Sequence, residues 1–152
     1  MASMVTDYAK ALFWATQGSD SRVDLKNDSF KMMLVTSSYT PTATHKYVAD
    51  LTPGSNELSG TGYVAGFNGA GRKALTGNAV APDNTNHVGY FSTSSPTWAG
   101  LNCGTAKYAV IIKEVTSDAA SIIVAIVDIG SYTSNGNDFT VTCPATDGWL
   151  YY

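Results

Sequence analysis

Short apolar runs separated by turn-forming residues dominate the chain, and this pattern is typical of β-structure. Five runs rich in β-branched and aromatic residues predict clear strands at 30–37, 62–67, 107–115, 121–129 and 139–143. Three weaker runs predict strands at 73–81, 87–92 and 149–152. Clusters of Gly, Asn, Asp, Ser and Pro lie between the runs. About eight strands spaced in this way predict an all-β fold, a jelly-roll-like or Greek-key β-sandwich or barrel with little helix.

The runs at 107–115 and 121–129 form the most clearly marked pair. They read "KYAVIIKEV" and "SIIVAIVDI" and flank the short connection "TSDAA", which is the arrangement of a β-hairpin. Both runs are apolar on two faces, whereas a strand with one wet face alternates between apolar and polar residues. We therefore expect the two strands to lie centrally, or to have one face covered by another subunit.

Helical periodicity is confined to two short places. The i, i+3, i+4 spacing of a helix face is met by Val5, Tyr8, Ala9, Leu12 and Phe13. This spacing predicts a short helix at 6–15, although "ALFWAT" also reads as a strand. The segment "THKYVADL" at 44–51 predicts one helical turn with Tyr47, Val48 and Leu51 facing inward.

Length and composition favour one globular unit. The 152 residues predict a single β-sandwich domain over 1–152, in which 1–7 form an extended N-terminal arm. Nine basic and twelve acidic residues give a net charge of −3, so no basic patch predicts a nucleic-acid partner. No apolar run approaches the roughly 18 residues of a membrane span, and no basic and apolar leader opens the chain. We expect a protein that stays in the cytoplasm, or in a particle assembled there.

One glycine-rich segment invites comparison with a phosphate site. A P-loop needs G-x-x-x-x-G-K-[ST], and in "GFNGAGRK" at 66–73 Arg72 stands at the lysine position and Lys73 at the hydroxyl position. No helical pattern follows to offer its N-terminus. Gly60, Gly62 and Gly66 also miss the dinucleotide spacing by one residue. We interpret the segment as a glycine-rich loop between strands and predict no cofactor.

The residues that most often carry catalysis or metals are sparse. His45 and His87 lie far apart, no G-x-S-x-G elbow is present, and no close pair of zinc ligands occurs. Cys103 and Cys143 favour two buried free thiols over one disulfide. The Asx-rich turns at 83–86 and 135–138 lack the acidic spacing of a calcium loop. We predict no catalytic, cofactor-binding or metal residues and no enzyme activity, although carboxylate pairs for glycoside hydrolysis would meet only in space.

Aromatic residues leave a second interpretation open. Nine tyrosines and three tryptophans could form a sugar-stacking platform, but Trp14, Trp98 and Trp149 share no predicted strand. Tyrosine and tryptophan are also favoured in cores and protein–protein contacts. Core and interface roles are therefore preferred to carbohydrate binding.

Several segments together resemble a family of small virion structural proteins of tailed bacteriophages and prophages. The resemblance begins with "DSFKMMLVTSSYTP", "THKYVADLT" and "ELSGTGYVAG", which fit the family patterns K-x-x-L-x-T-S-x-Y-x-P, H-x-Y/F-V-x-D and E-x-S-G-T-G-Y. It continues through "WAGL", "AKYAVIIKEV", "SIIVAIVDIGS" and "GNDFTVT" and covers roughly 24 to 142. The segment "GFNGAGRKALTG" is richer in glycine than such proteins, and the end "DGWLYY" is unusually aromatic, which invites burial of Tyr151 and Tyr152 by a neighbour.

The resemblance implies a structural role on a virus particle. It implies a capsid decoration (cement) protein that bridges major capsid subunits on the virion surface, assembled in the host cytoplasm. Its partners would be the major capsid protein and further copies of itself, as a homotrimer or a homodimer. The alternatives are a tail, baseplate or fibre component, or a carbohydrate-binding sandwich for host attachment.

Overall fold

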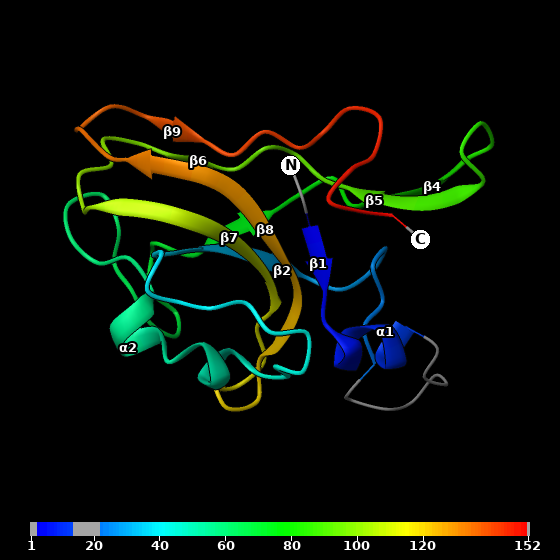
Figure 1. Cartoon of the computed structure of the whole chain (residues 1–152), viewed down its shortest axis with the longest axis horizontal. Helices are drawn as coiled ribbons and strands as arrows, with labels where there is room; N and C mark the ends of the chain where they lie inside the picture. The colour runs from blue at the N-terminus through cyan, green and yellow to red at the C-terminus, as the bar shows by residue number, and fades with distance from the viewer. Residues whose placement is uncertain (1–2, 14–21, 152) are drawn as a thin grey trace.

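A computed structural model of the chain describes residues 3–13 and 22–151 and shows three antiparallel sheets (Figure 1). The five-stranded sheet has the order β1-β8-β7-β2-β3, the three-stranded sheet β10-β5-β4 and the two-stranded sheet β6-β9. The strands are β1 (Ser3–Val5), β2 (Phe30–Val35), β3 (Lys73–Leu75), β4 (Ala79–Asp83), β5 (Val88–Ser92), β6 (Thr97–Trp98), β7 (Thr105–Lys113), β8 (Ile122–Thr133), β9 (Phe139–Thr140) and β10 (Leu150–Tyr151). The prediction of an all-β fold with little helix is confirmed.

The β7–β8 hairpin forms the middle of the large sheet, as its uninterrupted apolar sequence predicts. β7 pairs with β8 on one side and with β2 on the other, all antiparallel. An irregularity in register between Ile111 and Ile112 bends the hairpin, because β8 places an extra residue opposite this point. Of the two arrangements expected for these strands, the structure shows the central one.

Both faces of the large sheet are covered by the chain itself. One face carries Met33, Val35, Val110, Ile112, Ile123 and Ile126 and is covered by residues 36–51 through Tyr39, Val48 and Leu51. The other face packs against the smaller sheets and α1, with Phe30, Phe91, Trp98 and Trp149 as its largest buried side chains. Because burial of apolar surface is the main stabilising term, the sheet with its two covers forms the core of the domain.

Both predicted helical segments are present. α1 (Asp7–Phe13) buries Ala9 and Leu12, which lie on the face predicted from their spacing. η1 (Val48–Leu51) is a single 3-10 turn whose Val48 and Leu51 are buried. A third short element, α2 (Pro53–Asn56), begins at a proline, which suits the first turn of a helix because that position needs no N–H donor. No helix in the described part of the chain is long and apolar enough to cross a membrane.

Several expectations differ from the structure. The run at 73–81 is divided between β3 and β4, and the run at 139–143 forms only the short β9. The strand predicted at 62–67 is absent, and only isolated bridges such as Gly60–Tyr63 occur there. Gly60, Gly62 and Gly66 have positive φ angles, and a Cβ on Gly62 would lie 2.8 Å from the Gly100 carbonyl oxygen. The glycines therefore form tight turns that an extended strand cannot contain. Within the predicted arm at 1–7, residues 3–5 form β1 at the edge of the large sheet, and residues 1–2 lie outside the described residues.

The aromatic C-terminal segment lies in the core of its own chain. Trp149 and Leu150 are each 1% exposed, and the Trp149 indole Nε1 donates to Thr93 Oγ1 at 2.8 Å. The Trp149 backbone N–H donates to the Phe91 carbonyl at 2.7 Å. The chain itself therefore buries these two residues, whereas the side chains of Tyr151 and Tyr152, for which burial by a neighbour was predicted, lie outside what the structure describes.

The docking of this segment depends on Gly148. It has a φ of 59°, and a Cβ there would lie 2.2 Å from the Phe91 carbonyl oxygen. We predict that Gly148→Ala lowers the free energy of unfolding by about 2 kcal/mol or more, because backbone strain and a steric clash add. The matched control is Gly54→Ala in α2, where a Cβ meets nothing within 4 Å. Urea unfolding checks both variants, and equal midpoints would contradict the prediction.

Candidate functional site: a buried charge cluster and an exposed hairpin

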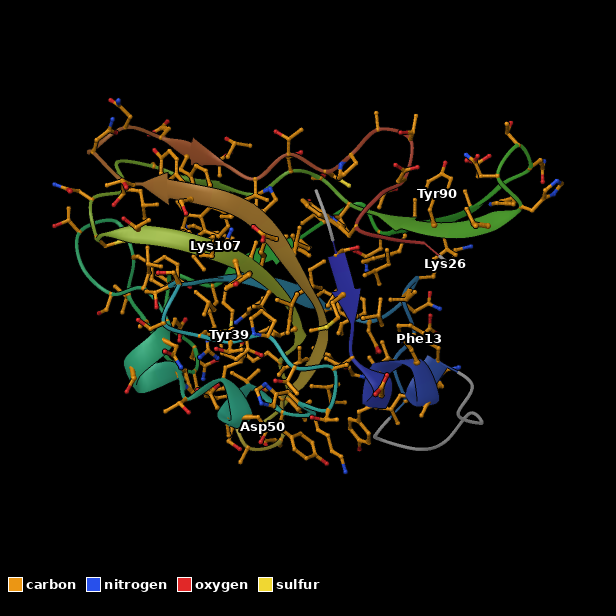
Figure 2. All side chains as sticks on the ribbon, viewed as in Figure 1. Phe13, Lys26, Tyr39, Asp50, Tyr90 and Lys107 are labelled. Carbon is orange, nitrogen blue, oxygen red and sulfur yellow. The ribbon has the colours of Figure 1, made fainter. Side chains whose placement is uncertain are left out.

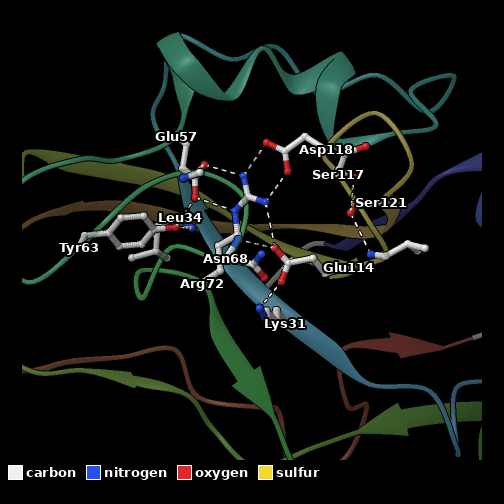
Figure 3. Close-up of polar contacts among 12 residues, drawn as sticks. Lys31, Leu34, Glu57, Tyr63, Asn68, Arg72, Glu114, Ser117, Asp118 and Ser121 are labelled. Carbon is white, nitrogen blue, oxygen red and sulfur yellow. Dashed lines mark hydrogen bonds and ion pairs between the residues drawn. The ribbon is translucent and has the colours of Figure 1, made fainter.

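Five charged side chains from distant parts of the chain meet beside the large sheet, and together they form the Arg72 cluster. Its members are Lys31, Glu57, Arg72, Glu114 and Asp118. Lys31 lies in β2, Glu57 follows α2, Arg72 directly precedes β3, and the two remaining carboxylates lie in the β7–β8 connection (Figure 3). The cluster thus joins four segments that are up to 87 residues apart in sequence, from Lys31 to Asp118.

Arg72 holds two carboxylates at the same time. Its Nε and Nη2 atoms donate to Glu57 Oε1 and Oε2 at 2.9 and 2.8 Å. Its Nη1 and Nη2 atoms donate to Asp118 Oδ1 and Oδ2 at 2.5 and 3.0 Å. Paired N–H donors of this kind match a carboxylate in both geometry and charge, so both contacts are of the strong type. The Arg72 and Glu57 side chains are 0% exposed, whereas that of Asp118 is 22% exposed.

Neutral donors complete the surroundings of Glu57. Its carboxylate accepts from the Tyr63 hydroxyl and from the Gly66 N–H, each at 3.1 Å. The Tyr63 oxygen in turn accepts from the Leu34 N–H of β2 at 3.0 Å. Burial and the adjacent Glu57 carboxylate raise the pKa of Tyr63 well above its ordinary value, so its hydroxyl keeps the proton that it donates.

The remaining carboxylate of the cluster, Glu114, is satisfied by two cations and one amide. It forms ion pairs with Lys31 and, at 3.5 Å, with Arg72, and its Oε1 accepts from the Asn68 N–H at 3.1 Å. Burial alone would lower the pKa of Arg72, but its hydrogen bonds to Glu57 and Asp118 raise it. Arg72 is therefore permanently charged, and the carboxylates act as its counter-ions. A general acid or base must exchange protons with a bound substrate, which the enclosed Glu57 carboxylate cannot reach.

The glycine-rich segment at 66–73 supplies this arginine and does not form a phosphate cradle. A Cβ on Gly69 would lie 2.3 Å from the Val64 carbonyl oxygen, so the loop closes tightly only with glycine there. Arg72 turns inward to the carboxylates, and Lys73 begins strand β3 instead of a helix. This agrees with the sequence interpretation of a loop. Sequence reasoning missed the cluster because its carboxylates come from two other segments, one at Glu57 and one in the β7–β8 connection.

The two histidines lie in different parts of the structure and have different surroundings. His45 Nδ1 and the Tyr39 hydroxyl are 2.7 Å apart, and burial raises the pKa of Tyr39 to about 12. His87 is exposed in the turn between β4 and β5 with a φ of 57°. Within the described residues, no group of three or more His, Cys, Asp or Glu side chains is placed to hold a metal ion. Cys103 and Cys143 are half-buried free thiols, and burial raises the pKa of each.

In the Asx-rich turns, side-chain oxygen atoms accept hydrogen bonds from backbone N–H groups of the same turn. Asp83 Oδ1 accepts from the N–H groups of Thr85 and Asn86 at 2.8 and 3.1 Å. In the second turn, Asn135 Oδ1 accepts from the Asn137 N–H at 3.2 Å. These bonds are those of Asx turns, which organise a reversal of the chain without a metal.

The aromatic rings contact one another instead of forming a flat platform. Tyr132 and Phe139 stack with their ring centroids 3.8 Å apart, and Phe139 stacks on the buried Trp98 at 6.0 Å. The Trp98 indole donates to the Gly71 carbonyl at 2.6 Å, directly beside Arg72. Trp14 lies outside the described residues. Ring faces that are occupied by other rings are not free to stack on a sugar.

The family-like motifs converge on internal contacts. The Tyr39 and His45 pair comes from the first two motifs, and Asp50 Oδ2 accepts from the N–H groups of Lys46 and Tyr47 at 2.8 and 2.9 Å. Burial acts to raise the pKa of Asp50, but these two bonds lower it below its ordinary value. Glu57 and Tyr63 of the third motif bond within the Arg72 cluster. These motif residues therefore make their hydrogen bonds within the chain itself.

The β4–β5 hairpin is the main exposed feature of the described residues. It extends beyond the body of the domain, at the right of Figure 1, and Lys26 and Tyr90 are labelled near it in Figure 2. Val80 in β4 is 51% exposed and borders two shallow depressions of about 400 and 340 Å³. One depression lies over the hairpin itself, and the other lies between Val80 and the side chains of Phe13, Val23 and Leu25. No sequence signal marked this surface, because β4 reads as a weak strand.

Comparisons with known proteins give no relatives: no protein-family model matches the chain, and neither a curated protein nor a solved structure is significantly similar to it.

The Arg72 cluster predicts a large loss of stability when its cation is removed. We expect Arg72→Met to lower the free energy of unfolding by about 3–5 kcal/mol, because Glu57 would remain buried without a counter-ion. The control is Arg22→Met, whose partner Asp24 and own side chain are 20% and 30% exposed, with an expected loss below about 1 kcal/mol. Urea unfolding of the two variants at neutral pH measures the difference. Similar losses for both would show that the cluster contributes no more than a surface ion pair.

Proposed function

We propose that this protein is a non-enzymatic virion structural protein of the capsid decoration type, which binds the major capsid protein on the outside of a tailed-phage head. One observation carries the proposal. The residues that give the chain its resemblance to small virion proteins, among them Tyr39, His45, Asp50 and Glu57, all bond within the scaffold. A protein whose most distinctive residues hold a rigid β-scaffold is suited to act through its surface.

Charge and composition support contact with other proteins. Nine basic and twelve acidic residues make up only 14% of the chain. Several of these charged side chains form ion pairs within the chain, in the Arg72 cluster and in pairs such as Lys113–Asp28 and Lys107–Asp128. The remaining surface is rich in Ser, Thr, Asn and Gly, which suits broad hydrogen-bonded and apolar contacts. Copies of the chain would occupy symmetric positions of the shell as homotrimers or homodimers.

Two other functions remain as alternatives. A tail, baseplate or fibre component would use the same scaffold at another place on the particle. A carbohydrate-binding sandwich would need open aromatic faces, and the stacked Tyr132, Phe139 and Trp98 rings argue against that use of these three residues. The decoration role is preferred because it needs neither a cleft nor a cofactor.

The test is the location of the protein and the chemistry of its attachment. We expect cryo-electron microscopy of the particle to place the chain on the head, and washing of purified particles to leave it bound at high salt. Screening acts on exposed charges over a Debye length of about 10 Å at 0.1 M but barely weakens buried apolar contacts. Occupancy is measured across a salt series and a urea series. Confinement to the tail would refute the decoration role, and release of intact protein by salt alone would refute the apolar attachment.

A further inference from the structure

The hydrogen-bonding direction of β4 can be worked out from two independent observations. Pro82 has no N–H, so it occupies a position that does not donate to β5. Phe91 is paired with Val80, but its carbonyl points away from β4 and accepts from the N–H of Trp149, the residue before β10. Successive residues of an antiparallel strand alternate in direction. Val80 and Pro82 therefore direct their backbone groups to the outer edge of the three-stranded sheet, whose order β10-β5-β4 leaves β4 last among the described strands.

This edge is protected only in part. Proline and charge are the usual means by which an edge strand avoids pairing with another chain, and β4 carries Pro82 near one end and Asp83 next to it. The opposite half, Ala79 and Val80, has neither proline nor charge, and Val80 is 51% exposed. At the root of the hairpin, Asn78 Nδ2 donates to the Asp28 carbonyl at 2.8 Å and fixes β4 to the segment that precedes β2.

We propose that β4 pairs with β4 of a second copy of this chain, antiparallel about a two-fold axis beside Val80. The two Val80 residues then exchange both of their outward N–H and C=O groups. Each Pro82 carbonyl accepts from the Asn78 N–H of the other copy, and the Asn78 carbonyl opposite Pro82 is the one outward group of this pair left without a donor. The small side chains of Ala79 and Ala81 lie opposite each other, and the result is a continuous six-stranded sheet.

The charges along the strand are complementary in this antiparallel register. The tip of the hairpin carries Asp83, and the residue opposite it in the partner is Gly77, at the root. The segment fixed to that root by Asn78 carries the exposed Lys26, two residues before Asp28. The acidic tip of one copy is therefore brought toward the basic side chain of the other. A parallel arrangement would place tip beside tip and carboxylate beside carboxylate, which is unfavourable.

The same arrangement accounts for the apolar hollow under Val80. In a hydrogen-bonded pair the two side chains lie on one face of the sheet, so both Val80 side chains point to the side on which Phe91 is buried. There they meet the depressions bordered by Phe13, Val23 and Leu25 of each copy. Dimer formation removes this apolar surface from water, which supplies the main favourable free energy. This pairing does not depend on the virion role, since it follows from the edge of β4 and from the surface beside that edge.

A charged substitution at the two-fold axis provides the first test. Sedimentation equilibrium of the full chain is expected to show a dimer, and Val80→Asp to raise its dissociation constant by about a hundredfold or more, because two carboxylates would face each other. Val64→Asp is the matched control, since Val64 is 62% exposed in a loop away from β4, and it should leave the dimer intact. Thermal unfolding confirms that each variant is folded. A monomeric wild type, or a dimer unaffected by Val80→Asp, would overturn the proposal.

A cross-link tests the register. Facing residues of a hydrogen-bonded antiparallel pair have Cα atoms about 5.5 Å apart, a separation that a disulfide spans. In a Cys103→Ser, Cys143→Ser background, Val80→Cys is expected to form a covalent dimer under mild oxidation, whereas Val64→Cys is not. Equal rates for the two cysteines would overturn pairing at Val80, whatever is found about the location of the protein on particles.

Discussion

The fold depends on one buried cation. Arg72 carries a charge in a place that water does not reach, and such a charge is tolerated only when opposite charges and hydrogen bonds surround it. Glu57 and Asp118 meet this requirement from either side. Tyr63 and Gly66 donate further hydrogen bonds to Glu57, and Asn68 donates to Glu114. Most of these side chains belong to segments between the strands, so the cluster fixes the positions of loops that strand pairing does not hold. It therefore links the loops at 57–72 to the β7–β8 hairpin and to β2.

This constraint explains the division of the molecule into a rigid body and a projecting hairpin. The body contains the large sheet with its two apolar covers. The β4–β5 hairpin follows Arg72 and β3 directly, and Asn78 and Trp149 fix it at its root while its tip stays exposed. A rigid base with an exposed strand edge is suited to binding protein, because little conformational entropy is lost when the edge pairs.

The sequence predicted the elements whose signals are local. The hairpin of β7 and β8, the helix at α1 and the turn at η1 each follow from periodicity within a few residues. The strand expected at 62–67 failed because φ angles of three glycines override the β-propensity of the Tyr-Val pair between them. The Arg72 cluster could not be predicted, since Glu57, Glu114 and Asp118 approach Arg72 only after the chain has folded. Likewise, the outward direction of Val80 depends on pairing with β5 and on Trp149, which is 69 residues away.

The most direct test of this account is a double-mutant cycle on Glu57 and Arg72. The free energy of unfolding is measured by urea for Glu57→Gln, Arg72→Met and the double variant. If the two side chains stabilise the fold as a pair, the loss of unfolding free energy in the double variant will be smaller than the sum of the single losses by about 2 kcal/mol or more. Each single variant leaves a buried side chain without its partner, and the double variant removes both. Losses that add to within about 0.5 kcal/mol would contradict the claim that this pair positions the loops.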